Sequence, residues 1–161
     1  MVAGTITLDI ESPLEAKRLW NATVKDGHNL LPKVAPEIVS GVTIVQGNGG
    51  VGTIKQVNFT PANKDFSYVK ESVVEINEGN FVYAFTHVEG GELGKNLASV
   101  KFEFKFSPKV GGGCVITWTC HFDTLPGVAH DEAKAQELKN NATGLFKKIE
   151  AYLLSNPALY C

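Results

Sequence analysis

The sequence has 161 residues, of which 43% are hydrophobic and 20% charged, the balance of a chain that can bury one continuous core. We therefore expect a single domain over residues 1–161. Its formal net charge of -2 provides no positive field for nucleic acid, which we do not expect as a partner. The sequence lacks both an apolar run of roughly 20 residues, as a membrane helix requires, and the basic start of a signal peptide. We expect a cytoplasmic protein with no membrane partner.

The N-terminal quarter predicts one strand and two short helices. Apolar and polar residues alternate over residues 6–10, which is the period-two pattern of a half-buried strand. Ser12 is expected to cap the first helix, with Glu15 as the partner in a capping box. The second helical piece is expected over residues 29–31 and should end at Pro32, because proline interrupts the backbone hydrogen bonds of a helix.

The middle of the chain predicts an antiparallel meander followed by one long helix. Apolar runs recur between turns that contain glycine or asparagine, as expected of strands joined by hairpins. These runs cover residues 42–45, 53–59, 66–76, 80–88, 98–106 and 114–122. With the N-terminal strand they make seven strands. Between Leu138 and Leu153 the apolar residues change to helical spacing, so a C-terminal helix should lie on the sheet.

Aromatic side chains share one face of several predicted strands. Alternation places Tyr83, Phe85 and His87 on one side of their strand, and Phe102 and Phe104 on one side of the next. Such rows usually form a close-packed core. However, only one long helix and two short ones can cover them, and buried hydroxyl and imidazole groups need polar partners. We therefore predict a mostly apolar pocket between the sheet and the long helix.

A glycine-rich segment precedes the third predicted strand, with Gly47, Gly49, Gly50 and Gly52. A phosphate-binding P-loop needs a Gly-Lys-Ser/Thr sequence that leads into a helix, whereas a period-two pattern follows here. We interpret the segment as a turn between antiparallel strands. Four glycines exceed what a turn needs, so close approach by a ligand or by another segment is expected.

Several stretches resemble the plant pathogenesis-related class-ten family, the family of the Bet v I birch pollen allergen. Residues 47–55, Gly-Asn-Gly-Gly-Val-Gly-Thr-Ile-Lys, look like its signature loop, and residues 26–36 look like its pair of short helices. Residues 68–71, 88–91 and 150–154 resemble its other markers, so the similarity covers the whole chain. It implies an α+β helix-grip fold, in which a seven-stranded curved antiparallel sheet wraps around a long C-terminal helix, with two short helices and a large internal apolar cavity.

The resemblance also implies a function in plant defence. Members are described as defence-induced cytosolic proteins that bind cytokinins, flavonoids, sterols and related plant metabolites, so small hydrophobic ligands are the expected partners. We expect a monomer without a cofactor, and the four histidines have no spacing that indicates a metal site. By positional match, the expected cavity lining is Leu31, Val39, Phe59, Phe66, Tyr68, Tyr83, Phe85, His87, Val100, Phe102, Phe104, Ile116, Trp118, Ala142, Leu145, Phe146 and Ile149.

A ribonuclease is the main alternative. Some members are credited with this activity, which is attributed to the loop lysine, a carboxylate in the sheet, and a glutamate and a tyrosine on the last helix. Lys55, Glu150 and Tyr152 match three of these positions, but residues 97–99 supply no acid at the fourth. Cleaving RNA by acid–base catalysis without a histidine pair or a metal is demanding. We therefore favour an ion pair between Lys55 and Glu150 that anchors the loop to the helix.

A condensing enzyme and a hormone receptor are less favoured functions, both found in relatives that share this fold. Some relatives condense amines with aldehydes by means of a lysine and acids inside the cavity, whereas Lys101 and Lys105 should face solvent here because they alternate with the inward aromatic residues. Abscisic-acid receptors carry a Ser-Gly-Leu-Pro-Ala gate, whereas residues 89–94 read Glu-Gly-Gly-Glu-Leu-Gly. We therefore expect a binding protein rather than an enzyme or a receptor of this type.

Overall fold

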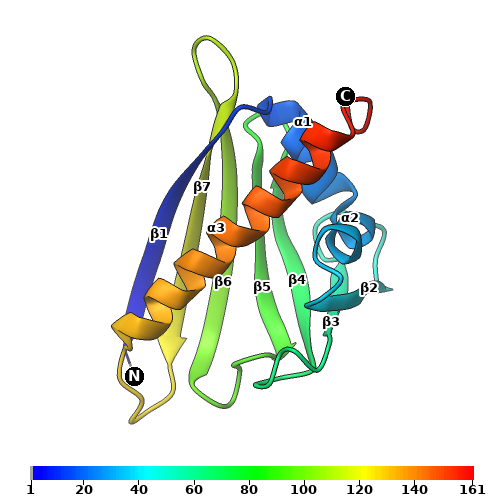
Figure 1. Ribbon diagram of the computed structural model, residues 1–161. Coiled ribbons are helices and arrows are strands. Elements are labelled where there is room, and N and C mark those ends of the chain that lie inside the picture. The colour runs from blue at the N-terminus through cyan, green and yellow to red at the C-terminus, as the bar shows by residue number, and fades with distance from the viewer. Residues whose placement is uncertain (1) are drawn as a thin grey trace.

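The computed structural model describes residues 2–161, which form a curved antiparallel sheet with helices packed on one face (Figure 1). The strands are β1 (Ala3–Ser12), β2 (Val39–Gln46), β3 (Ile54–Phe59), β4 (Tyr68–Asn77), β5 (Val82–Gly90), β6 (Leu97–Pro108) and β7 (Cys114–Thr124). Their order in the sheet is β1-β7-β6-β5-β4-β3-β2, so the first strand pairs with the last. The predicted α+β helix-grip fold is confirmed.

Side-chain alternation determines which face of the sheet is covered. Every second residue of β7, from Cys114 to Thr124, is buried, which is the pattern expected of a strand with one face on the core. In the register of β6 and β7, Phe102 lies opposite Cys120 and Phe104 lies opposite Trp118. The aromatic residues therefore share the face that carries the helices.

The helical segment that follows β1 differs from its prediction at both ends. It comprises α1 (Ala16–Trp20), the π-helical turn η1 (Asn21–Lys25) and α2 (Gly27–Val34). The capping box is wrong, because the hydroxyl of Ser12 accepts the N–H of Leu14 at 3.2 Å and the carboxylate of Glu15 accepts the N–H of Gly113 at 3.2 Å.

The second short helix continues past the predicted stop at Pro32. It extends to Val34, and the N–H of Ala35 donates to the carbonyl oxygen of Leu31 at 3.0 Å. The ring of Pro32 removes one backbone donor, but the helix is only eight residues long and buries Leu30 against the core. Tertiary packing therefore outweighs the cost of the proline.

The long helix α3 (Glu132–Ser155) crosses the sheet diagonally in Figure 1. Asp131 caps it, because its carboxylate accepts the N–H groups of Ala133 at 2.9 Å and Lys134 at 3.4 Å. The main backbone approach between α3 and the sheet is at β1. Phe146 extends from α3 toward β6, where its ring centroid lies 5.5 Å from that of Phe104. This ring contact joins α3 to the middle of the sheet.

The C-terminal segment is fastened to α1 and α2. The guanidinium group of Arg18 donates to three carbonyl oxygens between residues 153 and 159, at 2.7 to 2.9 Å. The hydroxyl of Tyr160 donates to the carboxylate of Asp26 at 2.5 Å. These bonds hold the end of α3 over the short helices. Within residues 2–161, no helix is both long and apolar enough to cross a membrane.

Candidate functional site

The inward aromatic side chains of β5, β6 and β7 form one continuous surface. We call it the aromatic wall, and it consists of Tyr83, Phe85, His87, Phe102, Phe104 and Trp118. The ring centroids of its neighbouring members lie 5.0 to 6.1 Å apart, within the range for favourable aromatic contacts. The prediction that these residues share one face is therefore confirmed.

Part of the aromatic wall is not covered by other side chains. Phe102, Phe104 and His87 are only half-buried, although they face the helices. Burial nevertheless lowers the pKa of His87 to about 4, so its imidazole is removed from bulk water and is neutral at pH 7. The predicted cavity would lie in this position, between the wall and α3.

Lys55 and Glu71 place two charged groups beside the wall. They lie opposite each other in β3 and β4, and Glu71 also lies opposite His87 in β5. The ammonium of Lys55 donates to the hydroxyl of Tyr83 at 3.5 Å and lies 5.6 Å from the centroid of its ring. Burial raises the pKa of Glu71 to about 7, and the positive charge of Lys55 opposes part of this rise. Burial also lowers the pKa of Lys55.

Glu71 is a site residue that the sequence pattern did not reveal. Its neighbours at period two, Val69 and Val73, are both buried, and an acid flanked in this way must share their inward face. Glu71 keeps some accessible surface, and burial is the main cause of its raised pKa. The interior is therefore more polar than the aromatic rows alone indicate.

The other predicted lining residues divide between two apolar clusters. Leu31, Val39 and Phe59 form a smaller cluster with Val57 and Val69, and the ring of Phe59 lies 5.4 Å from that of Phe66. The larger core beside the wall contains Val100, Ile116, Ala142, Leu145, Phe146 and Ile149.

The inward placement of the Tyr68 hydroxyl is wrong. This hydroxyl donates to the carboxylate of Glu89 at 2.7 Å, and Glu89 is exposed. The reason is the alternation of β4, in which the adjacent Val69 is the residue that faces the core.

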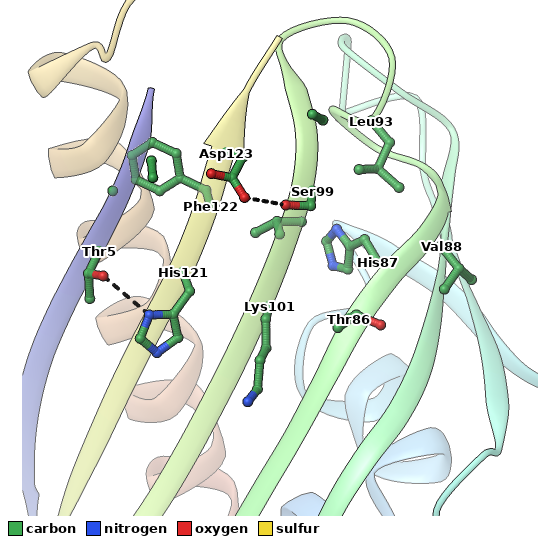
Figure 2. Close-up of a pocket in the computed structure, with 14 residues that line it drawn as sticks. Thr5, Thr86, His87, Val88, Leu93, Ser99, Lys101, His121, Phe122 and Asp123 are labelled. Carbon is green, nitrogen blue, oxygen red and sulfur yellow. Dashed lines mark hydrogen bonds between the residues drawn. The ribbon is translucent and has the colours of Figure 1, made fainter. Parts of the chain in front are cut away.

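A pocket of about 610 Å³ borders the outer face of the sheet (Figure 2), and the core residues Val100 and Phe122 also line it. Its floor includes a row that is in register across four strands, Thr5, His121, Lys101 and Thr86. Lys101 lies on this face as predicted, and α3 lies behind the sheet in this view. Of the predicted cavity lining, His87 and Val100 border this pocket.

Thr53, which follows the last glycine of the glycine-rich loop, closes this loop by a hydrogen bond to Gly49. Thr53 is 1% exposed, and its hydroxyl accepts the N–H of Gly49 at 2.8 Å. Gly47 has a φ of 97°, and a Cβ atom added to it would lie 2.8 Å from the Cα atom of Thr53. The close approach expected from the surplus glycines is therefore made by Thr53.

The residues of the ribonuclease alternative do not contact one another. The predicted ion pair between Lys55 and Glu150 is wrong, because Glu150 pairs with Lys147 at 3.4 Å. The reason is the position of α3, where Lys147 also donates to the carbonyl oxygen of Glu11 on β1, a strand that β7, β6, β5 and β4 separate from β3. Within residues 2–161, His, Cys, Asp and Glu form no group of three that could hold a metal ion.

Comparison with known families supports this architecture. The chain matches the family described as "Pathogenesis-related protein Bet v 1 family" over residues 1–156. It is 39% identical over 160 residues to "Pathogenesis-related protein 1" from Asparagus officinalis, and the aligned region covers 99% of each protein. It is 38% identical over 159 residues to "Major allergen Pru ar 1" from Prunus armeniaca, and the aligned region covers 98% of this chain and 99% of the allergen.

Solved structures of similar proteins have the same fold. The crystal structure of Ara h 8.0201 superposes with a TM-score of 0.83 and 32% identity, covering 96% of this chain and 99% of the other. Norcoclaurine synthase from Thalictrum flavum superposes with a TM-score of 0.79, covering 95% of this chain and 87% of the enzyme. Its identity is only 21%, so this second likeness shows the fold alone.

Proposed function

Because this chain belongs to the Bet v 1 family of pathogenesis-related proteins, we propose that it binds small hydrophobic plant metabolites or hormones, such as cytokinins, flavonoids or sterol-like molecules, on its aromatic wall. Family membership supports a defence-related, ligand-binding role. The observation that carries the proposal is the partial accessibility of Phe102 and Phe104 on the covered face of the sheet. The proposal includes a cytosolic location, a monomeric state and the absence of a cofactor.

The energy of binding would come mainly from apolar burial. A guest that loses about 300 Å² of apolar surface gains roughly 7 kcal/mol at 25 cal/mol per Å², before the cost of association. The polar groups at the edge of the wall would orient the guest. Neutral His87 can donate or accept a hydrogen bond, and the Tyr83 hydroxyl lies beside the ammonium of Lys55. Micromolar affinity is the expected result.

Titration calorimetry with a cytokinin and with a flavonoid tests the proposal. Phe104→Ala should weaken binding of both ligands, because it removes a half-buried ring from the wall. Lys105→Ala is the matched control, because Lys105 is the next residue of β6 and is exposed. Equal affinities for the wild type and Phe104→Ala would exclude the wall as the binding surface. Fractionation of plant cells and light scattering would test the cytosolic and monomeric assignments.

The ribonuclease alternative has lost its geometric support, since Lys55 and Glu150 have separate partners. It is tested by assaying RNA cleavage in Lys55→Ala and Glu150→Gln. Cleavage that is unchanged in both variants would identify a contaminating nuclease.

An amine–aldehyde condensation is the second candidate, and one observation favours it. Lys55 and Glu71 place a lysine and an acid on the covered face, where the sequence predicted apolar residues apart from His87 and the tyrosines. The norcoclaurine synthase of Thalictrum flavum has a similar fold. It has been crystallised with dopamine and hydroxybenzaldehyde. Incubating the protein with these two compounds and analysing products by chiral chromatography tests this candidate, with Glu71→Gln as the variant that should abolish turnover.

A further inference from the structure

Strands β5 and β6 separate at one end of the sheet. Their pairing covers residues 82–86 of β5 and residues 101–105 of β6. Beyond this point β5 continues along β4, whereas β6 continues along β7. In the part of the chain that the structure describes, residues 87–90 and 97–100 therefore do not pair with each other. We call the place where these two stretches separate the split.

A β-bulge on each strand explains why the strands separate. Val88 is the extra residue of β5, since its two neighbours pair with adjacent residues of β4. Ala98 is the extra residue of β6, since its two neighbours pair with adjacent residues of β7. Bulges bend a strand, increase its twist and are common next to functional sites. Two bulges that face each other across the split therefore indicate a feature with a function.

Two glycines hold the end of β5 against β4. Gly90 and Gly91 have positive φ values of 78° and 59°, a conformation that favours glycine. The N–H of Gly91 donates to the carbonyl oxygen of Tyr68 at 3.0 Å. A Cβ atom added to Gly90 would lie 2.6 Å from the same oxygen. This close contact requires glycine, and it keeps the end of β5 on β4 rather than on β6.

The pocket of about 610 Å³ lies at the split, and the extra residue of each bulge lines it. Its lining includes consecutive residues of β6 that face opposite sides of the sheet, because Val100 belongs to the core and Lys101 lies on the outer face. Phe122 and His121 of β7 line it in the same way. The pocket therefore reaches from the outer face of the sheet to the core.

His87 connects this pocket to the aromatic wall. Its side chain lines the pocket and also belongs to the wall, where its ring centroid lies 5.0 Å from that of Phe102. In Figure 2, the ring of His87 is visible between the ribbons of β5 and β6. Leu93 of the β5–β6 turn lines the same pocket and packs against the core. These two side chains lie where a guest would pass from the outer face to the wall.

Leu93 can move while the backbone of its turn stays in place. The carbonyl oxygen of Glu92 accepts the N–H groups of residues 95–97 at 3.1 to 3.2 Å, so the turn keeps its shape through its own hydrogen bonds. Rotation of a side chain is much faster than the opening of a strand pair or of a whole loop. Access through the split therefore needs a smaller rearrangement than the displacement of a helix.

We propose that guests enter the interior through the split, passing from the outer face of the sheet between β5 and β6 to the aromatic wall. The side chains of Leu93 and His87 move aside to admit them. The apolar side chains of Leu93 and Val100 favour an uncharged guest, because a charged one would lose its hydration against them. This route rests on the proposed function, since it needs a guest that binds to the wall.

Stopped-flow fluorescence with N-phenyl-1-naphthylamine, an uncharged dye that brightens in apolar surroundings, tests the route on the intact protein. Ala98→Trp should narrow the split, because Ala98 is an exposed bulge residue that lines it. Its association and dissociation rate constants should both fall about tenfold with Kd unchanged, because a route affects the barrier and not the bound state. Lys105→Trp is the matched control, since Lys105 is exposed on the same strand but does not line the pocket.

Leu93→Ala is a second variant, and it should have the opposite effect. Removing this side chain widens the inner end of the split, so both rate constants should rise about threefold. Because Leu93→Ala changes a different edge of the pocket, it keeps the test valid if Ala98→Trp does not fold.

Two results would overturn the proposal, and they differ in what they mean for the proposed function. Rate constants that are unchanged in both variants, with the dye still bound, would show that guests enter elsewhere, for example between α3 and the short helices. The proposed function would then stand without this route. A dye that does not bind to the wild type, or that binds equally well to Phe104→Ala, would reject the aromatic wall as the binding surface and the route with it.

Discussion

The ammonium of Lys55 on β3 lies 3.5 Å from the hydroxyl oxygen of Tyr83 on β5, although β4 runs between these two strands. The strand between them contributes Glu71, which is opposite Lys55 in the β3–β4 register. Three ionisable groups from three adjacent strands therefore share the covered face of the sheet. Their pKa values are coupled through burial and charge.

Removing the charge of Lys55 should change the titration of Glu71. In Lys55→Met, we expect the pKa of Glu71 to rise further above 7, because the positive charge that now opposes its burial is lost. Carbon-13 chemical shifts of the carboxyl group measure this pKa. Lys101→Met is the control, since Lys101 lies on the outer face of the sheet. An unchanged Glu71 pKa in Lys55→Met would contradict the coupling.

Glu71 and His87 should give opposite pH dependences of stability. Burial raises the pKa of Glu71 from 4.5 to about 7, so the folded state loses stability as the pH rises through this interval. Burial lowers the pKa of His87 from 6.5 to about 4, so stability is lost as the pH falls through that interval. Between pH 4.5 and 6.5 the two contributions, each with a slope of about 1.4 kcal/mol per pH unit, oppose each other.

Single substitutions should reveal each slope separately. Urea denaturation between pH 4.5 and 6.5 should show that Glu71→Gln becomes less stable as the pH falls, since only His87 then titrates. His87→Phe should become more stable as the pH falls, since only Glu71 remains. Parallel profiles for the two variants would show that these groups do not control the pH dependence.

The strands were predictable because their signals are local. Period-two alternation, such as that of β7, and the glycine-containing turns determine seven strands without any long-range information. The capping box was wrong because Glu15 bonds to Gly113, which is 98 residues away. No local pattern contains this contact. The extension of α2 past Pro32 depends in the same way on the burial of Leu30.

The candidate site was predictable where it follows from alternation. The aromatic wall was found because its residues occur at every second position of β5 and β6. The partner of Glu150 was not found, because it depends on where α3 crosses the sheet, which spacing does not determine. The inward position of Glu71 could have been predicted from the sequence, because it lies between Val69 and Val73 at period two. It was missed because an isolated acid in a strand is usually interpreted as exposed.

The glycine-rich loop should tolerate alanine at one position and not at another. Gly47 and Gly49 have φ values of 97° and 101°, so alanine is strained at both. A Cβ atom at Gly49 meets nothing within 4 Å, whereas one at Gly47 collides with Thr53. We expect Gly49→Ala to cost about 1 kcal/mol and Gly47→Ala clearly more, measured as the free energy of unfolding in urea. Equal costs would show that the collision is relieved by movement of the loop.

The cysteines should differ in their reactivity toward a thiol reagent. Cys114 and Cys120 are buried, and burial raises the pKa of Cys114 to about 11 and that of Cys120 to about 12, so almost no thiolate forms at pH 8. Cys161 is exposed. Native protein should therefore react at one cysteine and unfolded protein at all three. Cys161→Ser is the control, and it should abolish the reaction of the native protein.

The pairing of the first strand with the last has a consequence for synthesis. Ala3 lies opposite Asp123 in the β1–β7 register, and the bonds of Arg18 to the carbonyl oxygens near residues 153 to 159 join α1 to the opposite end of the chain. A nascent polypeptide cannot make either connection until the later partner has left the ribosome. The hairpins from β2 to β7 can assemble earlier, whereas β1 must wait, with its apolar side chains exposed, until β7 has emerged.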